Sequence, residues 1–170
     1  MNQYSTRMVV AHWLTLLLLI AAYCLGEEAH DARKEGGATI AMYVAHSLVG
    51  GAVVLVTLLR LFFRKSDGVP APVGTGMMDK VAKGIHHALY LVLFLLPFSG
   101  MMQVLNSDLF KAITTGDPML LPKKFTGVAA HEVHEVLVTV LMVLVVVHVV
   151  GALKHQLVMK DGLMKRMWFK

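Results

Sequence analysis

The stretch HEVLVTVLMVLVVVH, residues 134–148, decides how the rest of the chain folds. Between its two terminal histidines the only charged residue is Glu135. The run predicts one helix over 128–156, long enough to cross a membrane. His134 and His148 are fourteen residues apart, which on a helix is about 21 Å along the axis and an offset of about 40° around it. One face of the helix therefore presents a histidine near each end.

The composition is that of a membrane protein. Of 170 residues, 56% are hydrophobic and 16% are charged, with a mean hydropathy of +0.65, whereas soluble domains carry about 25% charged residues. The net charge of +5 gathers at the ends of apolar segments, so we interpret it as a topology signal and not as a nucleic-acid-binding surface. The single cysteine, Cys24, excludes an internal disulfide and the C-x-x-C-H motif of covalently attached haem.

Four apolar segments predict an all-α integral membrane four-helix bundle, a single domain over residues 1–170. The predicted spans are 8–26, 38–63, 77–105 and 128–156. The predicted connecting loops are 27–37, 66–76 and 106–126. A cleaved signal peptide is the alternative interpretation of the first segment, but no A-x-A cleavage site follows it.

The Lys and Arg residues predict the orientation of the bundle. With four spans, both termini and the middle loop share one side, and the two remaining loops lie on the other. Those two loops hold five of the sixteen Lys and Arg residues, namely Arg33, Lys34, Lys111, Lys123 and Lys124. Because cytoplasmic segments carry the excess of basic residues, both termini are predicted to be cytoplasmic.

Two further histidines lie inside apolar spans, at depths that match His148 and His134. His12 is near the cytoplasmic end of the first span, level with His148, and His46 is in the outer part of the second span, level with His134. One imidazole from each of two helices, on opposite faces of a porphyrin, is the ligation of a b-type haem. Polar side chains at this depth are costly and usually functional, which favours iron ligands over histidines that are only hydrogen-bonded in the core. We therefore predict two haem b sites, His12 with His148 and His46 with His134.

His131 is an alternative to His134 as the ligand in the outer part of the last span. On a helix it lies about 260° around the axis from His148, so His134 is preferred. The stretch containing both does not match the H-E-x-x-H zinc motif, because His131 and His134 are at i and i+3 instead of i and i+4.

His155 and Lys154 lie at the predicted cytoplasmic interface, at the end of the last span, and His155 is seven residues beyond His148. His155 is a candidate to bind or protonate a quinone head group near the inner pair, and a solvated interfacial histidine is the equally weighted alternative. His86 and His87 lie near the cytoplasmic start of the third span and are expected at the same interface.

Several motifs recur in the order expected of a known family. They are Arg7 before His12-Trp13, His46 with Gly50, Arg60-Leu61 with Arg64, Leu96-Pro97 with Gly100, His134-Glu135, His148 followed by Gly151-Ala152-Leu153-Lys154-His155, and Asp161-Gly162-Leu163 with Arg166-Met167. Together they resemble the bacterial cytochrome b561 family of small di-haem, four-helix membrane cytochromes, nearly end to end.

The resemblance implies a bacterial inner-membrane protein in which His12, His46, His134 and His148 hold two b haems that exchange electrons with ubiquinone. One member type is a superoxide oxidase, a superoxide:ubiquinone oxidoreductase that takes electrons from periplasmic superoxide. This sequence departs from that type by Gln156, where a second histidine is expected, and by the additional His131.

The sequence thus predicts a membrane oxidoreductase that links the periplasmic face to the ubiquinone pool. Lys111, Lys123 and Lys124 in the last outer loop are candidates to attract superoxide by steering, or are simply solvated. One alternative is a haem b shuttle or anchor between quinol and a periplasmic redox partner, without superoxide chemistry. An alternative of another class is a His-lined divalent-metal transporter or a purely structural bundle.

Overall fold

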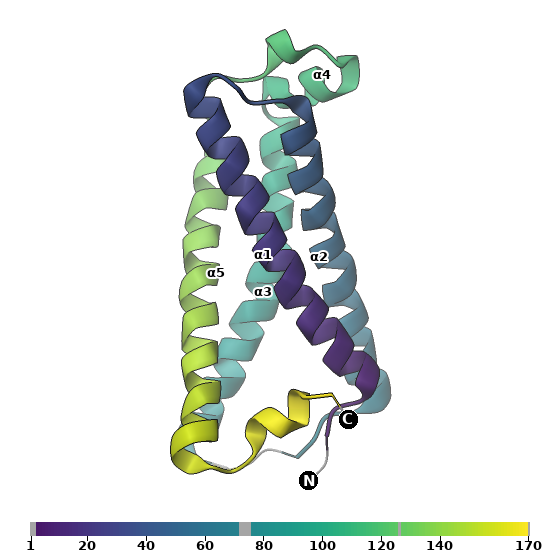
Figure 1. Ribbon diagram of the computed structural model, residues 1–170, viewed down its shortest axis with the longest axis vertical. Coiled ribbons are helices and arrows are strands. Elements are labelled where there is room, and N and C mark those ends of the chain that lie inside the picture. The colour runs from purple at the N-terminus through teal and green to yellow at the C-terminus, as the bar shows by residue number, and fades with distance from the viewer. Residues whose placement is uncertain (1–2, 72–75, 126, 170) are drawn as a thin grey trace.

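Four long helices form an all-helical bundle (Figure 1). The computed structural model describes residues 3–71, 76–125 and 127–169. The long helices are α1 (Thr6–Glu35), α2 (Ile40–Asp67), α3 (Met77–Leu105) and α5 (Ala129–Lys154). The shorter elements are α4 (Asp108–Thr115), the 3₁₀ turns Pro118–Leu120 and Leu163–Met167, and the π-helical turn His155–Met159.

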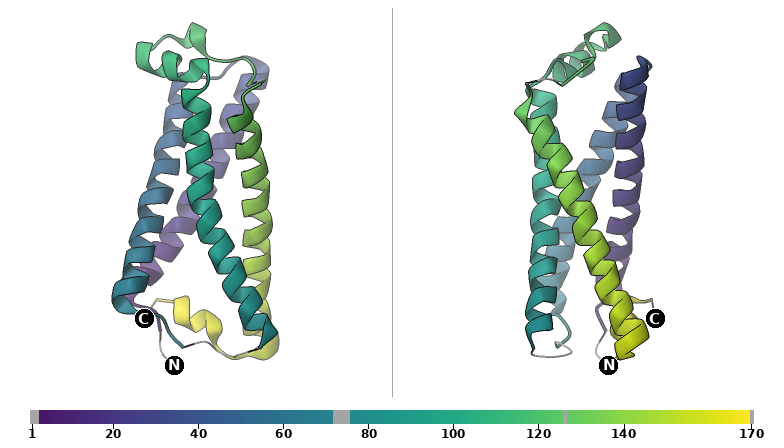
Figure 2. Two further views of the ribbon diagram at one scale, coloured as in Figure 1. Left: turned by 180° about the vertical axis from the view of Figure 1, so that it is seen from behind. Right: turned by 90° about the vertical axis from the view of Figure 1, so that its left-hand side faces the viewer.

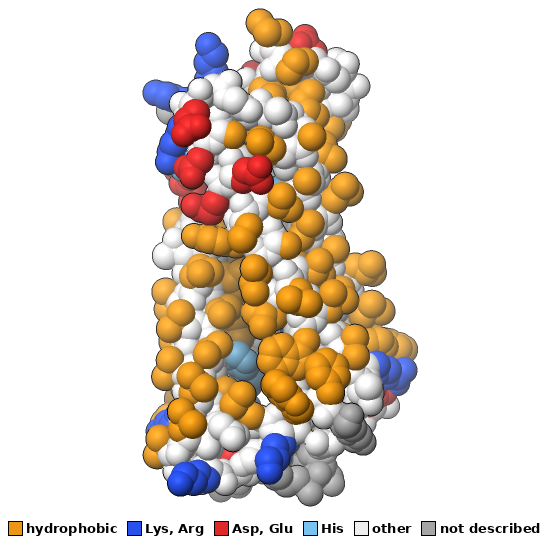
Figure 3. All heavy atoms as spheres, viewed as in Figure 1, with side chains coloured by type: hydrophobic (Ala, Val, Ile, Leu, Met, Phe, Trp, Pro, Cys, Tyr) orange, Lys and Arg blue, Asp and Glu red, His pale blue; other side chains and the backbone are white. Residues whose placement is uncertain are grey.

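All four long helices have the length and apolarity of membrane spans. Their most apolar windows have mean hydropathies of 2.2, 1.9, 1.9 and, with the π turn included, 2.9. Few of these apolar side chains are buried, and residues such as Leu17, Leu48 and Val146 lie more than half exposed. Figure 3 shows hydrophobic side chains along the middle of the molecule, with most of the charged groups toward its two ends. An apolar surface of this extent matches a bilayer as the surrounding solvent.

The first helix continues into the stretch 27–37, which the sequence predicts to be a loop. It ends only at Glu35, where Gly36 adopts the left-handed conformation with φ 80° and its N–H bonds the carbonyls of Ala32 and Arg33. The stretch is rich in Glu, Ala, Lys and Arg, which are strong helix formers in water. Polarity therefore ends the membrane-spanning part of the helix but not the helix itself.

The predicted outer loop 106–126 is also partly helical. Ser107 caps α4 through a bond from the Leu109 N–H to its Oγ (3.3 Å). Leu109 and Ala112 are 1% and 0% exposed, so the short helix is pinned to the end of the bundle by its apolar face. Pro97, by contrast, lies inside α3 without ending it, as membrane helices tolerate.

The bundle consists of two helix pairs. α1 packs along α2 and α3 along α5, and α2 and α3 join the pairs. α1 runs obliquely across the bundle (Figure 1), and the views from behind and from the side show α3 and α5 crossing in the same manner (Figure 2). Both termini lie at one end, and α4 lies at the other.

An apolar plug occupies the middle of the bundle. Val53, Val92, Leu93 and Leu141 form a buried cluster, with Leu18, Leu19, Leu144 and Val145 packed against it. Leu141 is seven residues from both His134 and His148, which is about 10 Å along the helix in each direction. The plug therefore separates the levels of the two histidine pairs and keeps water out between them.

Candidate functional site: two facing histidine pairs

Four half-buried histidines face one another in two pairs across the seam between the helix pairs. His12 of α1 faces His148 of α5, and His46 of α2 faces His134 of α5. The ring centres are 6.2 Å apart in both pairs. α5 thus contributes one side chain to each histidine pair, and the partner comes from the other helix pair, from α1 or from α2.

The separation of 6.2 Å suits one metal ion between two imidazoles. A metal–nitrogen bond of about 2 Å on each side, plus the distance from each nitrogen to its ring centre, gives roughly 6 Å. The two rings of a pair are also steeply inclined, at 64° and 74°, so they are not stacked on each other. The spacing fits an iron between each pair of rings.

The outer pair, His46 and His134, is oriented by hydrogen bonds at Nδ1 of each ring. His46 Nδ1 lies 2.9 Å from the carbonyl oxygen of Ala22. His134 Nδ1 lies 3.1 Å from the carbonyl oxygen of Leu96 and 3.0 Å from Ser99 Oγ, whose own hydroxyl donates to Leu96. A carbonyl oxygen only accepts, so both Nδ1 atoms carry the proton and donate. Each Nε2 then keeps its lone pair for a metal, which is the usual arrangement of ligating histidines.

Two glycines make room for the outer rings. A Cβ on Gly26 would lie 3.1 Å from Cε1 of His46, and a Cβ on Gly100 would lie 3.1 Å from Cε1 of His134. Each glycine follows by four residues the carbonyl that its ring bonds, Ala22 and Leu96 respectively. The helix surface beside each carbonyl is therefore left bare for an imidazole.

The inner pair, His12 and His148, has different neighbours. His12 Nδ1 lies 3.1 Å from Arg60 Nη2, and its ring meets the edge of Trp13 at 5.6 Å. The ring of His86, which the sequence analysis leaves at the interface, has its centre 5.2 Å from that of His148. Its Nδ1 donates to the Ala82 carbonyl (2.7 Å). The sequence signal for Arg60 is an arginine inside an apolar run, and none distinguished His86 from His87.

Three buried side-chain polar atoms on α2 have no hydrogen-bond partner within the described part of the chain, namely Tyr43 Oη, Thr57 Oγ1 and Arg60 Nε. Two of them lie near a histidine pair: Tyr43 Oη is one turn before His46, and Arg60 Nε is beside His12. Each lies level with one histidine pair or on its aqueous side. A porphyrin that bears carboxylate groups offers acceptors for both, whereas a bare metal ion does not. The residues present therefore fit haem at both levels.

His131 does not face His46. Its Nε2 is 3.3 Å from Glu135 Oε1, and its ring is 4.9 Å from that of Phe125. The structure places His134, not His131, opposite His46. Within 3–71, 76–125 and 127–169, no group of three or more His, Cys, Asp or Glu side chains is arranged to hold a metal ion.

The end of the bundle that carries both termini closes under His12 and His148. Trp13 Nε1 donates to the Met167 carbonyl (2.9 Å), and its ring meets Trp168 edge to face at 5.6 Å. Where α5 ends in the π turn, His155 Nδ1 lies 2.6 Å from Asp161 Oδ2. The hydrogen bond to His155 holds the pKa of Asp161 below its usual range. His155 thus keeps Nε2 for another partner, while the adjacent Lys154 is exposed.

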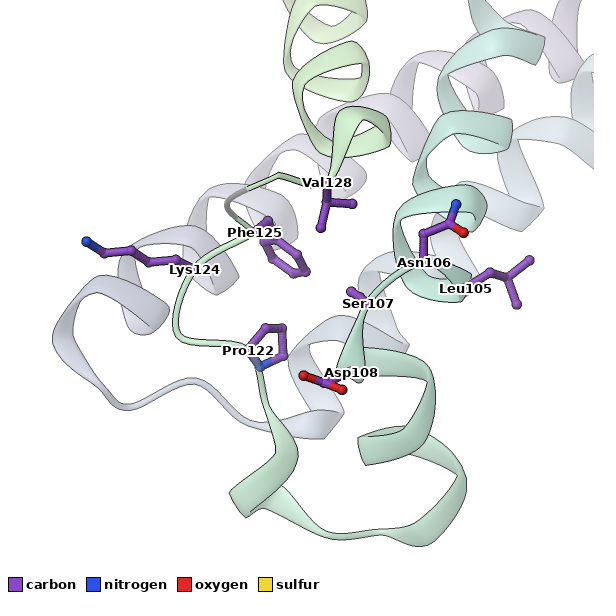
Figure 4. Close-up of a pocket in the computed structure, with 8 residues that line it drawn as sticks. All are labelled: Leu105, Asn106, Ser107, Asp108, Pro122, Lys124, Phe125 and Val128. Carbon is purple, nitrogen blue, oxygen red and sulfur yellow. The ribbon is translucent and has the colours of Figure 1, made fainter.

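The three outer lysines lie exposed around the α4 cap. Lys111 is on α4, and Lys123 and Lys124 precede α5. Beside them is an open hollow of about 430 Å³ (Figure 4). It is lined by Leu105, Asn106, Ser107, Asp108, Pro122, Lys124, Phe125 and Val128. The Lys124 side chain extends away from the other labelled side chains (Figure 4), which leaves its ammonium group to the solvent.

Comparison with known proteins finds a family and relatives that are similar over nearly the whole chain. The family model described as Prokaryotic cytochrome b561 matches residues 3–170. A protein named cytochrome b562 from Cereibacter sphaeroides is 32% identical over 96% of this chain and 94% of its own length. A protein named cytochrome b561 homolog 1 from Escherichia coli K12 is 25% identical over 98% of this chain and 97% of its own length.

Proposed function

The chain belongs to the prokaryotic cytochrome b561 family, and on that premise we propose that it holds two b haems, one between His12 and His148 and one between His46 and His134. Membership makes it a bacterial membrane cytochrome of the b type that transfers electrons. The observation that carries the two-haem proposal is the equal ring separation of 6.2 Å in both pairs. Haem supplies an iron that gains and loses one electron, and two histidine ligands leave no open position on it.

Main-chain and side-chain groups of this chain orient the histidines, keep the space between the two pairs apolar and place a positive charge beside one pair. Ala22 and Leu96 fix the outer imidazoles through Nδ1, and Arg60 sets a cation beside His12. The plug around Leu141 excludes water between the two levels. These roles suit electron transfer in single steps, since no substrate needs to enter the bundle and bind iron.

The proposed electron donor is superoxide at the periplasmic face, and the proposed acceptor is ubiquinone at the cytoplasmic side of the inner membrane. Two superoxide anions become two molecules of dioxygen and release two electrons. One ubiquinone takes those two electrons and two protons to become ubiquinol. Three exposed lysines at the outer end, Lys111, Lys123 and Lys124, support attraction of a small anion.

His155 and Lys154 are the proposed quinone-side residues. The contact of His155 Nδ1 with Asp161 Oδ2 orients the imidazole, whose Nε2 would then bind the quinone head group or pass it a proton. This role needs both termini in the cytoplasm, the orientation that the basic residues predict. In the runner-up function, the same haems would serve a periplasmic redox partner, and superoxide would not react.

Haem content and reduction kinetics test the proposal. Purified protein should give two haems b per chain by the pyridine-haemochrome spectrum, and His12→Ala and His46→Ala should each lose one. Superoxide mixed with the oxidised protein should reduce haem rapidly, and added ubiquinone should reoxidise it. Two haems with no superoxide reaction would leave the runner-up function, and colourless protein would favour the metal-transporter or structural alternative.

A further inference from the structure

Arg60 is a cation inside the bundle, beside the inner histidine pair. Its guanidinium Nη2 is 3.1 Å from His12 Nδ1, and its ζ carbon lies 5.4 Å from the centre of the Tyr90 ring. Its Nε is buried, and no partner for it lies in the described part of the chain. Among the same residues, the ion pairs of carboxylates involve Arg7, Lys34, His131 and His155, not Arg60. The charge is therefore not cancelled by an acidic side chain.

The outer pair has the opposite surroundings at the equivalent atom. Nδ1 of His46 faces the Ala22 carbonyl, and Nδ1 of His134 faces the Leu96 carbonyl and Ser99 Oγ. These partners accept hydrogen bonds and carry partial negative charge. Nδ1 of His12 instead faces a group that can only donate and carries a full positive charge.

These two surroundings shift an iron's reduction potential in opposite directions. Donation from Nδ1–H to an acceptor makes the imidazole more basic, and a more basic ligand stabilises the oxidised iron. A nearby cation stabilises the form that carries one positive charge fewer, which is the reduced iron. In the low-dielectric interior this Coulomb effect is much larger than it would be in water.

We propose that Arg60 raises the reduction potential of the haem between His12 and His148 above that of the haem between His46 and His134, so that electrons run inward. The proposal rests on the two-haem assignment under Proposed function. An electron released when superoxide becomes dioxygen then moves downhill from the outer pair to the inner pair. Two such electrons, with two protons, complete the reduction of one ubiquinone at the cytoplasmic side.

Arg60 acts in the same direction by either of two contacts. It raises the inner potential directly through its charge, and it also does so if it neutralises a carboxylate of the haem, because losing it would leave that carboxylate unpaired. Only one arrangement reverses the sign. If His12 has lost its Nδ1 proton to water and accepts the hydrogen bond of Arg60 there, the resulting imidazolate would stabilise the oxidised iron, and removing Arg60 would raise the potential.

The test is a redox titration of the purified holoprotein, followed in the haem absorbance bands. In Arg60→Gln, the equilibrium constant for reducing one haem should fall tenfold or more. Each factor of ten lowers that haem's midpoint potential by about 59 mV for a one-electron step. The other midpoint should stay in place. Arg60→Lys should keep most of the wild-type value because the charge remains. Repeating the titrations in a His46→Ala background, which lacks an outer ligand, assigns the shifted midpoint to the inner site.

Arg64→Gln is the matched control, since it removes the same charge one turn further along α2 from an exposed side chain. Its midpoints should differ little from wild type because water and salt screen an exposed charge. An inner midpoint that rises or stays unchanged in Arg60→Gln, with two haems still bound, would overturn the role of Arg60. Fewer than two haems in the unmutated protein would instead overturn the proposed function.

Discussion

Gly26 and His46 meet so closely that any larger residue at position 26 would press on the imidazole. A Cβ there would lie 3.1 Å from Cε1 of His46, closer than most Cβ contacts in proteins. The ring cannot simply swing away, because its Nδ1 is bonded to the Ala22 carbonyl one turn earlier on the same helix. α1 therefore contributes to the outer site without supplying a ligand to it.

Gly26→Ala should disturb the outer haem and spare the inner one. The displaced His46 ring would weaken its bond to iron, so haem content should fall from two toward one per chain, or the outer haem's low-spin spectrum should change. Pyridine-haemochrome quantification and electron paramagnetic resonance measure these two outcomes. Gly100→Ala should behave alike through His134.

Gly84→Ala is the control for both variants, because a Cβ there meets nothing within 4 Å. Alanine also favours a helix by about 1 kcal/mol over glycine, so all three variants gain the same intrinsic helix stability. Full haem content with unchanged spectra in Gly26→Ala would show that the contact does not position His46.

Ser99→Ala should raise the potential of the outer haem modestly. It removes the hydroxyl 3.0 Å from His134 Nδ1 but leaves the Leu96 carbonyl as an acceptor. The imidazole then becomes slightly less basic, which favours reduced iron. We expect a shift of less than tenfold in the reduction equilibrium, measured by redox titration, and a loss of about 1 kcal/mol of stability from the hydrogen bond. Ser47→Ala, at an exposed position of α2, is the control, and a lowered outer midpoint in Ser99→Ala would contradict the argument.

The hydrogen bond from His155 to Asp161 should make stability depend on pH. The bond keeps the pKa of the Asp161 carboxyl below its unfolded value, so its contribution is present above that unfolded value, about 4. It is lost as the pH falls through the lower folded value, because the unfolded chain binds the proton first. Asp161→Asn should therefore lower the Tm at pH 7, by an amount that corresponds to about 1 kcal/mol. The difference in Tm between the variant and the unmutated protein should become smaller toward pH 3.

Thermal loss of the haem spectrum at each pH measures this difference. Asp108→Asn, an exposed carboxylate at the opposite end of the molecule, controls for the change in net charge. A Tm difference that stays constant between pH 7 and pH 3 would mean that the Asp161 carboxylate does not stabilise the fold through its charge.

The three outer lysines should speed the reaction with superoxide. Replacing Lys111, Lys123 and Lys124 by Glu reverses the sign of the charge that an approaching anion meets, so superoxide-driven haem reduction should slow by about tenfold at low salt. The effect should diminish as salt screens the exposed charges. Stopped-flow absorbance over a range of ionic strengths measures both. The same substitution of Lys65, Lys80 and Lys83, at the end of the bundle opposite α4, is the control, and equal rates in all three proteins would exclude steering.

The sequence predicts the all-helical membrane bundle well because each span is a long apolar run, and a bilayer requires helices there. It predicts less well where a helix leaves the membrane, as at 27–35 in α1, because the polar residues that end a span are themselves helix formers. Depth also predicted which histidines face each other, because residues at the same level of a bundle can meet across it. Their role as haem ligands stays a prediction.

The neighbours of the histidines are harder to predict from sequence. Gly26, Gly100 and Arg60 act through side-by-side contacts whose partners lie on other helices. Those contacts depend on how the helices rotate and cross, which the apolar pattern leaves open because lipid accepts any apolar face. His86 shows the same limit, since the rotation of α3 about its axis decides that His86, and not His87, lies beside His148.

His131 and His134 should separate in a pair of single variants. His134 faces His46 at 6.2 Å, whereas His131 pairs with Glu135 and packs on Phe125. His134→Ala should therefore lose one haem per chain, and His131→Ala should keep two with a spectrum close to that of the unmutated protein. Because both variants remove an imidazole from one turn of α5, they control for each other's effect on the helix. Loss of a haem in His131→Ala, with retention in His134→Ala, would reassign the outer ligand and with it the geometry of the whole outer site.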